Sequence, residues 1–73
     1  MSKLPVVSGK KTIKALQRIG YYIRDRESSH VHLRHPTRVP LTIPDHKEIA
    51  RGTLRTIIRA AGLRVEEFSR LLK

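Results

Sequence analysis

The sequence predicts a two-layer α+β domain, with helices packed on one face of a three-stranded antiparallel sheet. Apolar residues repeat with a helical period near the start of the chain, with a period of two in the middle, and with a helical period again near the end. At 73 residues the chain can build one thin core, so we expect residues 1–73 to form a single domain. The sequence has no cysteine, which excludes a disulfide framework and thiolate zinc ligands.

The first helix is expected from about Gly9 to Ile19. Ser8 is a residue type that caps helix N-termini, and Gly20 is in position to end the helix. The apolar residues of this segment are Ile13, Ala15, Leu16 and Ile19, and its basic residues are Lys10, Lys11, Lys14 and Arg18. These two sets lie largely on different faces, so the helix is amphipathic with a basic outer side.

The first strand is expected to begin at Tyr21, where the period of the apolar residues changes to two. Tyr21 and Ile23 alternate with Tyr22 and Arg24, which is typical of a half-buried strand. Residues 26–28 are expected to form the turn into the second strand.

The second strand has one apolar face and one polar face. Val31 and Leu33 point to the apolar face, which must meet the helices. The opposite face is left toward water and carries His30, His32 and Arg34.

The third strand follows a second turn at residues 36–38 and is expected at an edge of the sheet. Pro40 has no N–H group to donate to a neighbouring strand, which excludes a central position. The alternating residues of this strand are Val39, Leu41 and Ile43 on one face and Pro40, Thr42 and Pro44 on the other.

A loop over residues 45–51 precedes two helical patterns at the end of the chain. Gly62 is in position to end the first pattern, and Glu66 and Glu67 suit the positive end of the second helix. The apolar residues that define the two patterns are Leu54, Ile57, Ile58 and Ala61, and then Val65, Phe68, Leu71 and Leu72. The chain is therefore expected to close with one or two helices.

The chain is strongly basic. Sixteen Lys and Arg residues against six Asp and Glu residues give a net charge of +10. Such an excess indicates a partner that carries phosphates, meaning RNA or DNA, or a strongly acidic protein. No apolar run is long enough for a signal peptide or a membrane span, so we expect a cytoplasmic protein without a membrane partner.

Three of the four histidines lie within residues 28–35, SSHVHLRH. They are open to three interpretations: a metal site, a proton-transfer site, or polar residues on a solvated sheet face. We expect no metal and no cofactor, because His30 and His32 have no carboxylate beside them to complete a ligand set. RNA supplies its own nucleophile in the 2′-hydroxyl, so a histidine among phosphate-binding cations is sufficient for cleavage. These features alone leave RNA binding and RNA cleavage as alternatives.

Three segments together resemble the HicA family of toxin mRNA interferases, whose partners are HicB antitoxins. LPVVSGKKTIKALQRIGY is similar to the family's opening helix, and SSHVHLRHP resembles its signature strand, which usually reads Gly-Ser-His followed by alternating apolar residues. VPLTIPDHKEIARGTLRTIIRAAGLRVEEF resembles the third strand, the Pro-x-His loop, the Gly-Thr-Leu helix start and the closing Glu-Glu-Phe. The segments occur in the family's order and spacing over nearly the whole chain.

The resemblance implies a small double-stranded-RNA-binding-like fold, α-β-β-β-α, used as a ribosome-independent ribonuclease. The family's catalytic histidine directly follows the Ser of Gly-Ser-His, which is the position of His30. Ser28 replaces the family's glycine, so either this turn has ordinary φ or Ser28 bears a strain on the order of 1–3 kcal/mol. His46 matches the family's Pro-x-His position. It could be a second acid or base or a phosphate contact, and the favoured interpretation is a loop anchor that bonds a backbone carbonyl.

The sequence thus predicts the toxin of a type II toxin–antitoxin pair, a metal-independent RNA endonuclease with His30 as its catalytic acid or base. The expected RNA contacts are Lys10, Lys11, Lys14, Arg24, Arg26, His32 and Arg34, and Arg51, Arg55 and Arg59 are further candidates for phosphate or partner binding. His35 is expected to have a structural role. The expected inhibitor is a HicB-type antitoxin that covers the histidine face. A non-catalytic double-stranded-RNA-binding module and a basic structural protein of a ribonucleoprotein are the alternatives.

Overall fold

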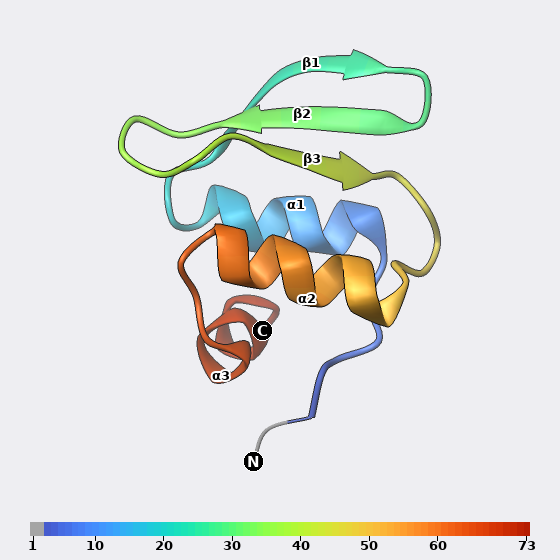
Figure 1. The fold of residues 1–73 in the computed structure, drawn as a ribbon, viewed down its shortest axis with the longest axis vertical. Coiled ribbons are helices and arrows are strands. Elements are labelled where there is room, and N and C mark those ends of the chain that lie inside the picture. The colour runs from blue at the N-terminus through green and yellow to red at the C-terminus, as the bar shows by residue number, and fades with distance from the viewer. Residues whose placement is uncertain (1–2) are drawn as a thin grey trace.

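A computed structural model describes residues 3–73 (Figure 1). The elements are α1 (Gly9–Gln17), β1 (Tyr22–Glu27), β2 (His30–Arg34), β3 (Leu41–Pro44), α2 (Arg51–Ala60) and α3 (Val65–Leu71). The strands form one antiparallel sheet in the order β1-β2-β3. α1 and α2 lie side by side under the sheet, and α3 packs below them (Figure 1). The predicted fold class is confirmed, and the chain closes with two helices.

The first helix begins as predicted and ends earlier. The Ser8 hydroxyl accepts a hydrogen bond from the Lys11 N–H at 3.1 Å, which caps α1. The helix ends at Gln17 instead of continuing to Ile19. At its start, a Cβ atom on Gly9 would lie 2.2 Å from the carbonyl oxygen of Pro44, a contact that only glycine avoids. Gly9 therefore allows the beginning of α1 to rest against the end of β3.

The core lies between the sheet and the helices. Val31 and Leu33 of β2 are both 0% exposed and face the helices, as predicted. The other side chains with no exposed surface in this core include Leu16, Ile43, Leu54 and Phe68. Each large apolar side chain buried in this way contributes about 1.5–3 kcal/mol. The opposite face of the sheet, called the outer face below, is left without a helix over it (Figure 1).

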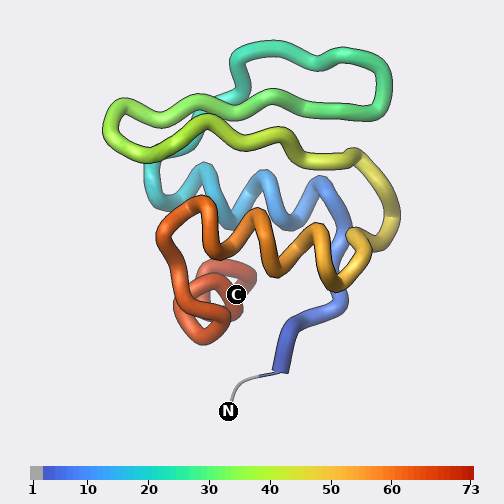
Figure 2. The backbone as a smooth tube through the Cα atoms, viewed as in Figure 1, coloured from blue at the N-terminus to red at the C-terminus, as the bar shows by residue number. Residues whose placement is uncertain are grey.

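The prediction of a half-buried first strand is wrong. All six residues of β1 are exposed, and the Ile23 side chain is 44% exposed. Tyr21 is buried, but it precedes the strand. β1 lies at the edge of the sheet farthest from the helices, which contact β3 instead (Figure 2). The period of two correctly indicates a strand, but it does not indicate whether a helix covers that strand.

The first turn also lies later than predicted. Arg26 and Glu27 belong to β1, and Glu27 pairs with His30, so Ser28 and Ser29 alone form the hairpin loop. Ser28 has a φ of 57°, in the left-handed region that favours glycine. Two-residue hairpin loops require positive φ because it matches the twist of the paired strands. The sequence left open whether this turn has ordinary φ or whether Ser28 is strained, and the structure shows the strained conformation.

Replacing Ser28 with glycine is expected to raise the free energy of unfolding by about 0.5–1 kcal/mol. The left-handed conformation costs a non-glycine residue roughly 1–2 kcal/mol, and the greater freedom of glycine in the unfolded chain offsets part of this gain. Urea denaturation of both proteins would measure the difference. Ser29→Gly is the matched control, since Ser29 is not among the residues with positive φ, and it should destabilise the protein. A loss of stability in Ser28→Gly would contradict the strain.

The connection between β2 and β3 packs against Tyr21. The Tyr21 hydroxyl donates a hydrogen bond to the carbonyl oxygen of Val39 at 2.9 Å. Burial raises the pKa of the Tyr21 phenol, and the positive charge of Arg38 opposes this effect. The phenol therefore stays protonated at neutral pH and holds the connection. Val39 itself is 52% exposed and precedes β3, although the alternation of apolar residues predicts it in the strand.

None of the helices within residues 3–73 is long and apolar enough to cross a membrane.

Candidate active site

His30 is the first residue of β2 and lies exposed on the outer face of the sheet. Its direct neighbours in the sheet are Glu27 on β1 and Pro44 on β3. Within the described residues, the His30 ring makes no hydrogen bond and no ion pair. Both ring nitrogens are therefore available to a bound molecule.

The backbone around His30 is held by the residue that follows β3. The Asp45 N–H donates a hydrogen bond to the carbonyl oxygen of Ser29 at 2.7 Å. The Asp45 carboxylate also pairs with the Arg26 guanidinium at 2.7 Å. These two contacts join the β1–β2 turn to the end of β3, so the backbone beside His30 is hydrogen-bonded on the β3 side as well.

A small basic hollow lies at the same end of the molecule. Ser8, Lys10, Asp45, His46 and Lys47 line this hollow, which has a volume of about 270 Å³. The beginning of α1, the end of β3 and the β1–β2 turn all lie at the right-hand end of the view in Figure 1. Lys10 and Lys47 thus add positive charge at the end of the molecule that carries His30.

Lys47 is a residue that sequence reasoning missed as a candidate phosphate contact. It follows the Pro-x-His segment directly, and that segment follows the strand that pairs with His30. The position of Lys47 directly after this segment was the sequence feature that could have identified it as a candidate. The His46 carbonyl oxygen accepts a hydrogen bond from the Gly9 N–H at 2.8 Å, so the backbone of His46 anchors the loop. The favoured interpretation was a ring that bonds a backbone carbonyl group, whereas the contact observed here is made by the main chain of His46, so the role of its ring stays a prediction.

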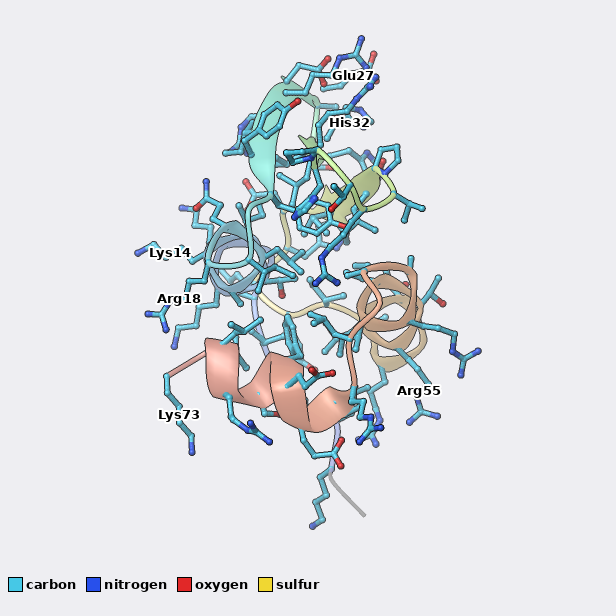
Figure 3. The ribbon with its side chains drawn as sticks, turned by 90° about the vertical axis from the view of Figure 1, so that its left-hand side faces the viewer. Lys14, Arg18, Glu27, His32, Arg55 and Lys73 are labelled. Atoms are coloured by element: carbon cyan, nitrogen blue, oxygen red, sulfur yellow. The ribbon has the colours of Figure 1, made fainter. Side chains whose placement is uncertain are left out.

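The expected RNA contacts do not form one cluster. Lys10 and Lys11 lie at the His30 end, whereas Lys14 projects sideways from α1 (Figure 3). Arg34 ends β2, four residues from His30, which corresponds to about 13 Å along a strand. The set is therefore distributed over α1 and the sheet and does not surround a single point.

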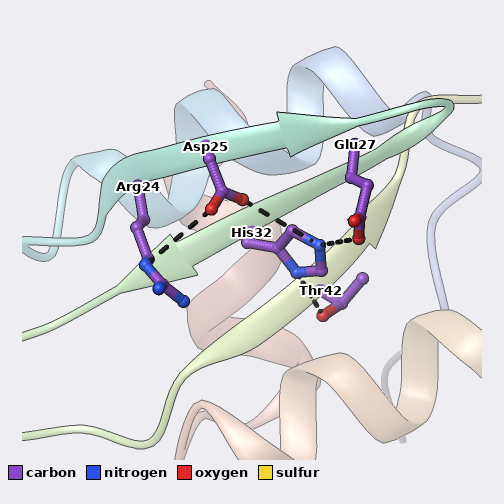
Figure 4. Close-up of polar contacts among 5 residues, drawn as sticks. All are labelled: Arg24, Asp25, Glu27, His32 and Thr42. Carbon is purple, nitrogen blue, oxygen red and sulfur yellow. Dashed lines mark hydrogen bonds and ion pairs between the residues drawn. The ribbon is translucent and has the colours of Figure 1, made fainter.

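Two members of that set on β1 are near carboxylates. Arg26 pairs with Asp45, as described above. The Arg24 Nε atom lies 3.8 Å from a carboxylate oxygen of Asp25 (Figure 4). Part of the positive charge of β1 is therefore compensated within the protein.

His32 lies among polar side chains at the centre of the outer face (Figure 4). Its Nδ1 atom lies 3.1 Å from the Thr42 hydroxyl, and its Nε2 atom lies 3.4 Å from the Glu27 carboxylate. An Asp25 carboxylate oxygen is 4.0 Å from the same Nε2 atom. The expectation that no carboxylate lies beside the histidines is therefore wrong, because the tight hairpin brings Asp25 and Glu27 against β2. Even so, no group of three or more His, Cys, Asp or Glu side chains within residues 3–73 could hold a metal ion.

His35 has contacts of a different kind. Its Nε2–H donates to the carbonyl oxygen of Ile19 at 2.7 Å, and its Nδ1 accepts from the Thr37 and Arg38 N–H groups at 3.0 and 3.1 Å. Its ring also meets the Tyr21 ring edge-on, with centroids 4.8 Å apart. These contacts agree with the structural role expected for His35. Of the three clustered histidines, His30 is the one whose ring is free within the described part of the chain.

The sequence of the chain was compared with models of known protein families. A family model described as the HicA toxin of bacterial toxin–antitoxin matches residues 9–63, more than half of the 73-residue chain. The chain belongs to the HicA toxin family. Comparison with curated proteins gave no match. As a HicA-family chain, the protein is a toxin of the toxin–antitoxin class. The matched range contains His30 and every residue that lines the basic hollow except Ser8.

Proposed function

We propose that this HicA-family toxin is an RNA endonuclease that cleaves mRNA by proton transfer at His30. The observation that supports the proposal most directly is the free ring of His30, exposed on β2 at a basic end of the molecule. The rings of His32 and His35 are already engaged by protein groups. His30 is therefore the histidine best able to exchange a proton with RNA.

The proposed reaction uses the nucleophile of the RNA itself. A neutral His30 ring takes the proton of a 2′-hydroxyl, and the 2′-oxygen then bonds to the adjacent phosphorus. The bond between phosphorus and the 5′-oxygen breaks, and this leaving oxygen takes up a proton from the protonated ring or from water. General acid–base assistance of this kind is typically worth about 10²–10⁴-fold in rate.

The phosphates of the RNA would be held by exposed cations. Our proposed contacts are Lys10, Lys11, Lys14, Arg24 and Arg34 from the sequence, with Lys47 added from the basic hollow. Neutralising phosphates releases bound counterions, and this release supplies much of the affinity of proteins for nucleic acids. Arg26 is assigned mainly to holding the β1–β2 turn through Asp45.

The proposed inhibitor is an antitoxin of the HicB type. The outer face of the sheet has no helix over it, and it carries His30 together with a cleft lined by Arg24, Asp25, Arg26, Glu27 and His32. An antitoxin that lies on this face would exclude RNA from His30 without changing the fold.

Cleavage of RNA by the purified protein is expected to persist in excess EDTA. The reason is that proton transfer at His30 needs no metal ion. A defined mRNA transcript would be incubated with the protein in the presence and absence of EDTA, and the products would be separated by electrophoresis. Activity that disappears with EDTA and returns only with added divalent cations would contradict the mechanism. RNA that is bound but never cut would favour the non-catalytic double-stranded-RNA-binding module.

A further inference from the structure

The Glu27 carboxylate does not contact the residue directly opposite to it. Glu27 pairs with His30 across the β1–β2 hairpin, and directly paired side chains lie on one face with Cβ atoms about 4.5–5.5 Å apart. The carboxylate instead reaches the diagonal neighbour His32, with an oxygen 3.4 Å from Nε2. The Glu27 side chain is 84% exposed, so packing does not fix this choice.

The choice between the two histidines has chemical consequences. A carboxylate beside His30 would accept a hydrogen bond from its ring and favour the charged imidazolium. It would also occupy a ring nitrogen that RNA needs, and it would place a negative charge where a phosphate approaches. With the carboxylate on His32, both nitrogens of the His30 ring stay free, and the negative charge of Glu27 acts on His30 only from a longer distance.

Few other carboxylates are within reach of these two histidines, and Arg34, two residues after His32, is a cation on the same face of β2. Asp25 lies directly opposite His32 and is shared with Arg24, at 4.0 and 3.8 Å respectively. On the β3 side, His32 faces the uncharged Thr42 and His30 faces Pro44. The next residue, Asp45, is paired with Arg26. Glu27 is therefore the carboxylate that can move from one histidine to the other.

We propose that His32 is a positioning residue that holds the Glu27 carboxylate away from His30 and so keeps the His30 ring free. The functional consequence rests on the proposed cleavage at His30, whereas the contact itself can be tested on the protein alone. In this role His32 does not exchange a proton with RNA. Its two ring nitrogens hold Glu27 on one side and Thr42 on the other.

The test compares two variants that both remove the charge of the ring. His32→Gln keeps a side-chain N–H that can hold Glu27, whereas His32→Ala keeps none. The probe is a pH titration of the His30 ring protons by NMR on the full chain. The titration midpoint of His30 is expected to be higher in His32→Ala than in His32→Gln by about half a pH unit, since the released carboxylate stabilises the charged ring. If His32→Ala does not fold, His32→Ser, which is too short to reach Glu27, takes its place.

Two further substitutions identify the carboxylate. Adding Glu27→Gln to both variants should abolish the difference in midpoint, whereas adding Asp25→Asn should leave it unchanged. Equal midpoints in His32→Ala and His32→Gln would overturn the proposal. So would a difference that persists after Glu27→Gln, because another group would then be responsible.

A parallel cleavage assay separates this inference from the proposed function. At pH values below the titration midpoint of His30, the RNA cleavage rate of His32→Ala should be about threefold lower than that of His32→Gln. A threefold difference in rate corresponds to a difference of about half a pH unit between the midpoints. If the NMR results are as expected and the wild-type chain cuts no RNA, the proposed function fails and the positioning of Glu27 stands. If the wild-type chain cuts RNA and the two variants have the same pH–rate profile, the positioning role fails and the proposed function stands.

Discussion

RNA cleavage is expected to fall by about 10²–10⁴-fold when His30 is replaced by alanine, because this is the usual value of one general acid or base. The fold should be unaffected. His30 lies exposed on the outer face, and its ring contacts no hydrogen-bonding partner within the described residues. Surface substitutions of this kind usually change the free energy of unfolding by less than about 0.5 kcal/mol. RNA binding should also be retained, since the cations are unchanged.

Three measurements on His30→Ala make this prediction decisive. Single-turnover cleavage of a labelled transcript gives the rate, fluorescence anisotropy gives the affinity for RNA, and thermal denaturation confirms the fold. His32→Ala serves as the comparison on the same strand and should have a much smaller effect on the rate. A folded His30→Ala protein that cuts RNA as fast as the parent would remove His30 from the mechanism.

The free energy of unfolding is expected to drop by roughly 2–3 kcal/mol when His35 is replaced by alanine. The His35 ring lies in the connection between β2 and β3, where its Nδ1 accepts hydrogen bonds from the Thr37 and Arg38 N–H groups. Its Nε2–H donates to the carbonyl oxygen of Ile19 and so joins this connection to the end of the first helix. Its loss leaves two partly buried groups, the Ile19 carbonyl and the Arg38 N–H, without partners, at about 1 kcal/mol or more each. The exposed Thr37 N–H can bond to water instead. Contact with the Tyr21 ring is lost as well.

Thermal denaturation would show this loss as a decrease in Tm of roughly 10–20 °C for a domain of this size. His46→Ala is the matched control, because it makes the same chemical change at an exposed residue whose anchoring contact is through its backbone. The control should lie within about 0.5 kcal/mol of the parent. Equal stability of His35→Ala and His46→Ala would show that the His35 hydrogen bonds contribute little.

Periodicity was sufficient to predict the order and type of the elements. It also placed Val31 and Leu33 toward the helices, since an apolar face must be covered in a folded domain. It did not predict the exposure of Ile23, because alternation describes one strand at a time. Whether a helix reaches under an edge strand depends on how wide the helical layer is, and that is a property of the whole fold.

The candidate site was predicted in part. Alternation along β2 correctly placed His30 and His32 on the outer face. The neighbours of these histidines could not be predicted, because they depend on the hairpin register, and the register depends on Ser28 adopting a positive φ. A turn over residues 26–28 would have left Glu27 in a loop, whereas the observed two-residue turn places it directly opposite His30.

The exposed first strand has a consequence for the behaviour of the protein in solution. An edge strand carries a row of backbone N–H and C=O groups that another chain can pair with, and native proteins block such pairing with charges and bulges. β1 has both, since residues 24–27 are all charged and the register shifts between Ile23 and Asp25. The charged residues of β1 therefore oppose the addition of a fourth strand from a neighbouring molecule. Uncharged replacements along residues 24–27 would convert this edge into a site of self-association.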